Sequence, residues 1–308
     1  MISIIICSAD ADNLNAVLQN IKETIGIEHE IIAFDNSLAK KGICEIYNLG
    51  IRKAKYDLIC FMHEDISIKT SDWGSLVNQI FSKDPGIGII GVAGGGYKAL
   101  APSGWYCVEF ENSDISFQNI LQGYKEAVKD PVHAYDNPRN EKLSEVVCVD
   151  GVWFCTRKSI AEQNLFDEKL LKRFHGYDLD FCLNVFGKYK ISVTYDILLE
   201  HASEGNFDKS WLDEILKVHK KWNRYLPLTI SNVSEKEIYL TEKRAIKNLI
   251  DKMLRWGYSF GSVQQMLLSG TASKRMPLRL FFKGYIHLLR KHLNNIISQT
   301  DLPRTFLL

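Results

Sequence analysis

The chain has 308 residues, 46% of them hydrophobic and 24% charged, which are the proportions of an ordinary globular protein. Its 38 lysines and arginines balance 37 aspartates and glutamates, so no overall charge draws it to nucleic acid, and we expect no such partner. No apolar run approaches the roughly 20 residues that span a bilayer, and the N-terminus lacks a basic leader. Seven scattered cysteines without a C-x-x-C pair indicate buried thiols in a reducing compartment. We therefore expect a cytoplasmic protein, with any membrane contact confined to its surface at the inner face.

The N-terminal part alternates apolar runs with amphipathic stretches. Residues 3–8 ("SIIICS"), 29–37 ("HEIIAFDNS") and 57–65 ("DLICFMHED") have the pattern of strands buried on both faces. Apolar residues recur at helical spacing over 14–25 and 43–51. Strands and helices that alternate with short links predict a right-handed parallel βαβ sheet.

The rest of the chain divides by its pattern. A helix over 73–81 and a fourth strand over 87–96 are followed by residues 97–145, which lack a clear period and indicate a long excursion over a site. From about residue 209 the pattern is helical and rich in Lys, Arg, Trp and Leu. We expect an α/β domain over residues 1–208 and a helical C-terminal extension over 209–308.

Polar residues stand at the ends of the first three strands. Ser8 and Asp35 end two of them, and the third delivers His63, Glu64 and Asp65 together. Acids at a strand end are ordinarily solvated turn residues. Because ligands bind at the carboxyl edge of a parallel sheet, the convergence of all three ends favours a binding site.

Further candidates lie in the second half of the domain. Asp178, in "GYDLD", is placed either to cap the helix that begins there or to act as a general base. Asp180 lies about 200° around that helix and is suited to orienting its neighbours. Trp153 is either an exposed stacking platform or a core residue, and His201, after a later strand, is either a ligand or an ordinary histidine.

Four segments in chain order resemble the family 2 glycosyltransferases with the GT-A fold, over roughly residues 1–205: "SIIICS", "EIIAFDNS", "IYNLGIRKAKYDLICFMHED" and "FDEKLLKRFHGYDLDFCL". Within that family, "FMHED" and "HGYDLDFC" most resemble a bacterial subgroup named after a streptomycin-biosynthesis protein. The resemblance implies a Rossmann-like, mixed but mainly parallel sheet flanked by helices. It also implies transfer of a sugar from a nucleotide-diphosphate donor to a hydroxyl acceptor, with inversion, in polysaccharide or glycoconjugate synthesis.

The resemblance also implies roles for the candidate residues. Asp178 matches the catalytic base, Asp65 and His201 match ligands of a divalent metal (Mn²⁺ or Mg²⁺), and the remaining candidates belong to the nucleotide-sugar side (Ser8, Asp35, Glu64, His63) or the acceptor side (Trp153, Asp180). Carboxylate oxygens suit a hard cation that neutralises a leaving diphosphate. The sequence departs from the usual Asp-x-Asp, because His63 occupies the first position and imidazole favours softer ions than magnesium.

The sequence leaves open two alternative functions and the role of one helical surface. A degenerate protein of the same fold would bind a nucleotide or glycan, or assemble a complex, without catalysis. A nucleotidyltransferase is disfavoured because no glycine-rich basic loop follows the first strand. In the tail, one helical face carries apolar residues flanked by Lys and Arg (Leu278, Phe282, Tyr285, Leu289, Leu293, Ile296). Such a helix either rests on an anionic membrane or covers the catalytic domain or a partner in a homodimer, and the covering role is favoured.

Overall fold

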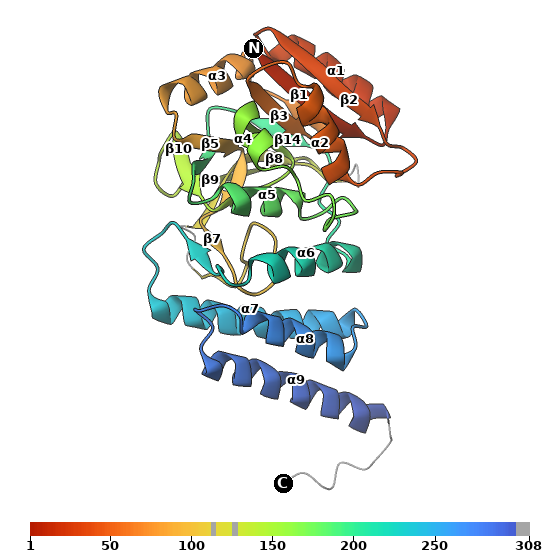
Figure 1. Cartoon of the computed structure of the whole chain (residues 1–308), viewed down its shortest axis with the longest axis vertical. Helices are drawn as coiled ribbons and strands as arrows, with labels where there is room; N and C mark the ends of the chain where they lie inside the picture. The colour runs from red at the N-terminus through yellow and green to blue at the C-terminus, as the bar shows by residue number, and fades with distance from the viewer. Residues whose placement is uncertain (112–114, 125–128, 300–308) are drawn as a thin grey trace.

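The N-terminal part is built on a seven-stranded mixed sheet (Figure 1). The computed structural model describes residues 1–111, 115–124 and 129–299, with side chains to residue 294. In spatial order the strands are β10 (Leu143–Val146), β13 (Lys190–Thr194), β5 (Ile87–Gly91), β12 (Trp153–Arg157), β3 (Leu58–Met62), β1 (Ile2–Ser8) and β2 (His29–Asp35). β1 pairs in parallel with β2 and β3, and β13 with β5, whereas β12 and β10 run antiparallel to their neighbours. The expected mixed, mainly parallel sheet is confirmed.

Helices cover both faces of this sheet because successive side chains of its strands point to opposite sides. Ile4 and Ile6 of β1 pack with α1 (Ala11–Thr24) and α3 (Trp73–Lys83). Ile5, between them, packs in a second cluster with side chains of helices on the other face: α2 (Ile43–Lys53), α4 (Lys158–Gln163) and α5 (Tyr177–Val185). Burial on both faces explains why the strand sequence is continuously apolar.

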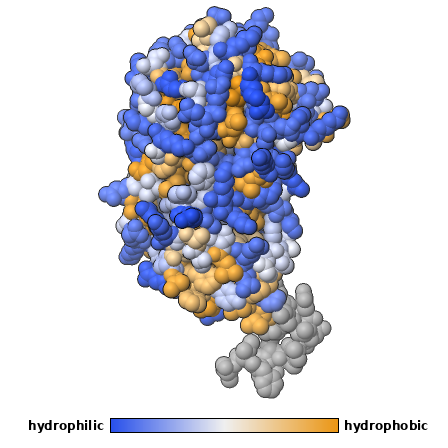
Figure 2. Space-filling model, in the orientation of Figure 1, coloured by the Kyte–Doolittle hydropathy of each residue, from blue (hydrophilic) through white to orange (hydrophobic). Residues whose placement is uncertain are grey.

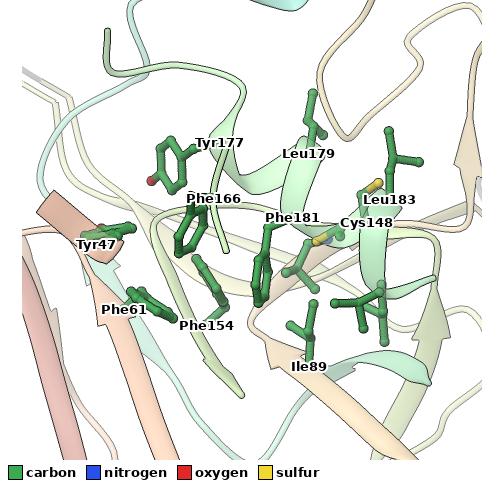
Figure 3. Close-up of a cluster of buried hydrophobic side chains, with 14 of the residues drawn as sticks. Tyr47, Phe61, Ile89, Cys148, Phe154, Phe166, Tyr177, Leu179, Phe181 and Leu183 are labelled. Atoms are coloured by element: carbon green, nitrogen blue, oxygen red, sulfur yellow. The ribbon is translucent and has the colours of Figure 1, made fainter. Parts of the chain in front are cut away.

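An aromatic cluster supports the start of α5 from below (Figure 3). It contains Tyr47, Phe61, Phe154, Phe166, Tyr177 and Phe181. Phe61 stacks on Phe154 with ring centroids 5.0 Å apart, and Phe166 stacks on Phe181 at 4.8 Å. Tyr177, the first residue of α5, meets Tyr47 edge-on at 5.5 Å. Close packing therefore fixes the helix turn that carries Asp178.

A second sheet lies at the carboxyl edge of the first one. Its strands are β11 (Cys148–Val149), β6 (Ala93–Gly95), β8 (Ser116–Gln122), β14 (Leu199–His201) and β4 (Ile66–Ile68), with β9 (Val132–Asp136) beside β8. Part of residues 97–145 is thus regular, and the expectation of an excursion without a period was wrong for β8, β9 and β10. Polar side chains obscure the strand pattern: the buried Asn119 donates its side-chain amide to the carbonyls of Tyr195 and Ile197.

The C-terminal helices stack beneath the α/β part (Figure 1). They are α6 (Lys209–Trp222), α7 (Glu235–Arg255), α8 (Phe260–Gly270) and α9 (Leu278–Gln299). α6 joins the two parts, because Ile215 and Val218 belong to the α/β core and Leu212 to the helical core. A short ribbon of β7 (Tyr97–Lys98) and β15 (Leu228–Thr229) lies between them, and Tyr97 donates its hydroxyl to the buried Glu242 of α7 at 2.6 Å.

Candidate active site

The first two strand ends lie side by side, as expected from a parallel sheet. Ser8 of β1 is paired in register with Asp35 of β2. Ser8 is buried, whereas the carboxylate of Asp35 is exposed and accepts a hydrogen bond from the Ser37 amide at 2.9 Å. That amide lowers the pKa of Asp35, so its side chain stays ionised.

Glu64 holds the loop that follows β1. One of its carboxylate oxygens accepts hydrogen bonds from the amides of Ala9, at 2.9 Å, and Asp10, at 3.2 Å. These bonds bring the segment after β3 against the segment after β1. Because its oxygens accept from these two amides, Glu64 orders the loop that follows β1.

His63, Asp65 and His201 form a cluster of metal-ligand type. Each offers one ligand atom, and the three atoms lie within 4.8 Å of one another. β14 delivers His201 opposite Ile66 of β4, immediately after Asp65. The backbone secures the arrangement further, because the Ala202 amide donates to the carbonyl of Asp65 at 2.9 Å.

Asp65 is the acidic centre of this cluster. Its Oδ2 atom lies 3.4 Å from His201 Nε2 and accepts a hydrogen bond from the Ser203 hydroxyl at 2.7 Å. Burial opposes ionisation, but the bonds from His201 and Ser203 outweigh it and lower the pKa of Asp65 well below its usual range. The carboxylate is therefore charged at neutral pH, as a metal ligand must be.

A tyrosine fixes the orientation of His63. The Tyr177 hydroxyl donates its hydrogen to the carbonyl of Gly151 at 3.1 Å, so its oxygen accepts from Nε2–H of His63 at 3.0 Å. The network thus assigns the proton to Nε2 and leaves the Nδ1 lone pair on the side of Asp65, 3.8 Å from Oδ1. Burial, and then the nearby His201, lower the pKa of His63 and favour this neutral form.

Asp178 stands in the first turn of α5 and faces a second carboxylate. Its Oδ2 atom accepts a hydrogen bond from the Gly151 amide at 3.2 Å. Burial, and then the charge of Asp150, raise the pKa of Asp178 to about 7. The helix cap is the backbone of Gly176, with no side-chain cap bond. A carboxyl poised near pH 7 is suited to accept a proton from a substrate hydroxyl.

Asp150 is a residue of this site that sequence reasoning missed. Its Oδ2 atom accepts from the indole N–H of Trp105 at 2.5 Å and its Oδ1 from the Val152 amide at 2.8 Å. Its position directly before a glycine, after the short β11, was a weak signal. Tyr177 was also missed, because a helix-initial tyrosine gives no hint of a distant histidine partner.

The two acceptor-side candidates lie away from this surface. Trp153 is completely buried in the core beside Trp73, with ring centroids 5.9 Å apart, so it offers no face to a sugar. Asp180 is also buried and is bonded to Lys221, at 2.9 Å, and to the indole N–H of Trp222, at 2.7 Å. Both assignments are corrected: Trp153 is a core residue, and Asp180 locks α5 onto α6.

Known structures share this architecture. The chain is similar to residues 1–349 of TarS from S. aureus, solved with UDP-GlcNAc, at 10% identity and a TM-score of 0.53, covering 94% of this chain and 88% of that one. It is also similar to GalNAc-T7, solved with UDP, GalNAc and Mn²⁺, at 11% identity and a TM-score of 0.52, covering 98% of this chain and 58% of that one. A search of curated protein sequences finds no match. These likenesses define the class of the fold as GT-A.

A family described as "Glycosyltransferase like family" matches residues 3–223. That range covers most of the chain and includes every residue of the site. The chain belongs to this glycosyltransferase-like family, as the resemblance in its sequence led us to expect.

Proposed function

We propose that this protein is an inverting, metal-dependent transferase that moves a sugar from a nucleoside-diphosphate donor to a hydroxyl acceptor. The observation that carries the proposal is the pairing of two features at one sheet edge: the His63–Asp65–His201 cluster and the carboxyl of Asp178, whose pKa is raised to about 7. One feature suits the leaving diphosphate and the other suits the attacking hydroxyl.

The donor atoms of the cluster fit a divalent metal. Two imidazoles and one carboxylate suit manganese better than magnesium, because imidazole is a softer ligand than oxygen. When bound, the ion would supply positive charge to the leaving diphosphate. We assign the nucleotide side to Ser8 and to the ionised, exposed Asp35, with Glu64 ordering the loop that follows Ser8.

Asp178 performs the proton transfer in the proposed reaction. The acceptor oxygen attacks the anomeric carbon while the bond from that carbon to the diphosphate oxygen breaks, so the configuration inverts. The hydroxyl proton passes to the carboxylate of Asp178, and the diphosphate departs with the bonding electron pair. Asp150 is held by the indole N–H of Trp105 and the amide of Val152, so it orients the site and does not attack the sugar.

The setting of the reaction is also a proposal. All seven cysteines lie in described residues and are unpaired, which supports a reducing cytoplasmic compartment. We further propose the bacterial subgroup named after a streptomycin-biosynthesis protein and an acceptor in polysaccharide or glycoconjugate synthesis, on the strength of "FMHED" and "HGYDLDFC".

A donor screen tests the proposal. Nucleoside-diphosphate release from a panel of UDP- and GDP-sugars is measured with Mn²⁺ and with EDTA, using the native chain, Asp178→Asn and a matched control, Asp12→Asn, in the first turn of α1. We expect Mn²⁺-dependent release that Asp178→Asn reduces by about 10²- to 10⁴-fold and Asp12→Asn leaves unchanged. Donor binding without any release or transfer would instead identify a degenerate, nucleotide-binding member of the family.

A further inference from the structure

The terminal helix α9 has one side that packs on the protein and one that does not. Leu280 and Leu288 are buried in the helical core, and Gly284 lies against Ile246 of α7 and Leu267 of α8. Among the described residues, α9 packs on α7 and α8, so the expected cover over the catalytic domain was wrong.

The free side of α9 is apolar. Five large side chains between 37% and 72% exposed lie along it: Leu278, Phe282, Ile286, Leu289 and Leu293. At about 100° per residue they fall within an arc of about 80°, which makes one continuous stripe. The expected stripe is corrected at Tyr285, which turns inward and stacks on Phe281 at 5.9 Å, while the side chain of Ile296 lies outside the described residues. Figure 2 shows hydrophobic residues gathered toward this lower end of the molecule.

Cations line one edge of the stripe. Arg279, Lys283 and Arg290 are exposed and lie about 100° to 140° around the helix from Leu278, directly beside the apolar arc. Arg279 stacks on the ring of Tyr239, with its guanidinium carbon 4.1 Å from the centroid, which leaves its charge available. By contrast, Lys291 on the packed side is neutralised by Asp251 at 3.1 Å.

The charge of this end of the chain is strongly one-sided. Residues 252–300 contain eight lysines and arginines and no aspartate or glutamate, whereas the whole chain has a net charge of +1. A helix that combines an exposed apolar stripe with flanking cations and no acids complements an anionic lipid surface. Two copies of this face would instead oppose like charges, which disfavours a dimer through the stripe.

We propose that α9 docks the protein on a bilayer rich in anionic lipids. The helix lies in the plane of the interface, with the stripe among the upper acyl carbons and Arg279, Lys283 and Arg290 against the lipid phosphates. Among the described residues, no helix is long and apolar enough to cross a membrane. Contact of this kind is reversible and falls with ionic strength.

Vesicle sedimentation of the full chain tests the proposal. One set of vesicles contains phosphatidylcholine alone and the other contains phosphatidylcholine with about one third phosphatidylglycerol. The charge variant carries Arg279→Gln, Lys283→Gln and Arg290→Gln. A matched control loses three exposed lysines of the α/β part: Lys22→Gln, Lys83→Gln and Lys142→Gln.

We expect the native chain to bind only the anionic vesicles. Each cation near such a surface strengthens binding about fivefold, so the charge variant should bind about 100-fold more weakly and the matched control nearly as well as the native chain. A second variant, Phe282→Ser with Leu289→Ser, should lose binding to anionic vesicles while remaining folded by circular dichroism, because both side chains are exposed.

Three results would overturn the proposal. The first is equal binding of the native chain to both kinds of vesicle, and the second is an equal loss of vesicle binding in the charge variant and its matched control. The third is a lipid-free dimer, seen by sedimentation velocity, that the variant Phe282→Ser with Leu289→Ser converts to a monomer. The last result would assign the stripe to a second copy of the chain. Binding is measured without substrate, so the outcome is independent of the transferase assay.

Discussion

Replacing Asp178 by Asn should stabilise the fold while disabling the enzyme. The native carboxyl has a pKa raised to about 7 by burial and by Asp150, whereas in the unfolded chain it ionises near its ordinary value of 3.8. Between these values the folded state binds the extra proton, so native stability falls as pH rises through that window. Asn keeps the shape and can still accept the hydrogen bond from the Gly151 amide, but it carries no charge.

The size of the effect follows from the shift in pKa. A difference of about three units sets a ceiling of about 4 kcal/mol on the destabilisation at pH 8, since one unit corresponds to about 1.4 kcal/mol. At pH 5 only about one unit of this pKa difference contributes to the destabilisation, because pH 5 lies about one unit above the pKa of the carboxyl in the unfolded chain. Because the side chain is partly exposed and solvent screens it, we expect the advantage of Asp178→Asn to grow by about 1 to 2 kcal/mol between pH 5 and pH 8.

Urea unfolding at the two pH values measures this change directly. Asp12→Asn, an exposed acid in the first turn of α1, is the matched control and should show no such growth. Asp180→Asn should instead destabilise the fold, because it weakens the contacts with Lys221 and Trp222. A stability difference for Asp178→Asn that is the same at pH 5 and pH 8 would refute the raised pKa and, with it, the basis for choosing Asp178 as the base.

We make four further predictions about other residues of the site. Asp65→Ala should abolish the rise in melting temperature caused by Mn²⁺ and leave the metal-free fold intact; a rise that persists would place the metal elsewhere. Tyr177→Phe should weaken Mn²⁺ binding about 10- to 100-fold by releasing the histidine it orients, and unchanged affinity would reject that role. Asp35→Ala should weaken nucleoside-diphosphate binding in calorimetry, because it removes a hydrogen-bond acceptor at the end of β2. Asp150→Asn should move the acid limb of the pH–rate profile to lower pH, since it removes a like charge beside Asp178; a limb that stays in place contradicts the coupling.

The local sequence was enough to predict the residues at the strand ends, because each apolar strand and the polar residues at its end lie within a few positions of one another. The run from Leu58 to Met62 is apolar throughout and buried throughout, and His63, Glu64 and Asp65 must then emerge at the sheet edge. The same logic placed Ser8 and Asp35 correctly at the ends of β1 and β2. Periodicity and parallel-sheet geometry suffice for this part of the fold.

Contacts between distant segments could not be predicted in this way. Trp153 follows Gly151 at a position that suits an exposed platform, yet it is buried beside Trp73, eighty residues earlier in the chain. Asp150 gains its role from Trp105, 45 residues away. In α9, Tyr285 is half-buried and the more apolar Ile286 is exposed, and only the packing of the helix decides which of them faces outward.

The segment around Gly151 ties the two halves of the site together. Its amide donates to Asp178, its carbonyl accepts from Tyr177, and the next carbonyl, of Val152, accepts the amide of His63 at 2.9 Å. A Cβ atom at Gly151 would lie 2.3 Å from the Tyr177 hydroxyl, so only glycine allows this approach. Asp178, the proposed base, and His63 of the proposed metal site therefore share one rigid support, and we expect a displacement of that turn to disturb proton transfer and metal binding together.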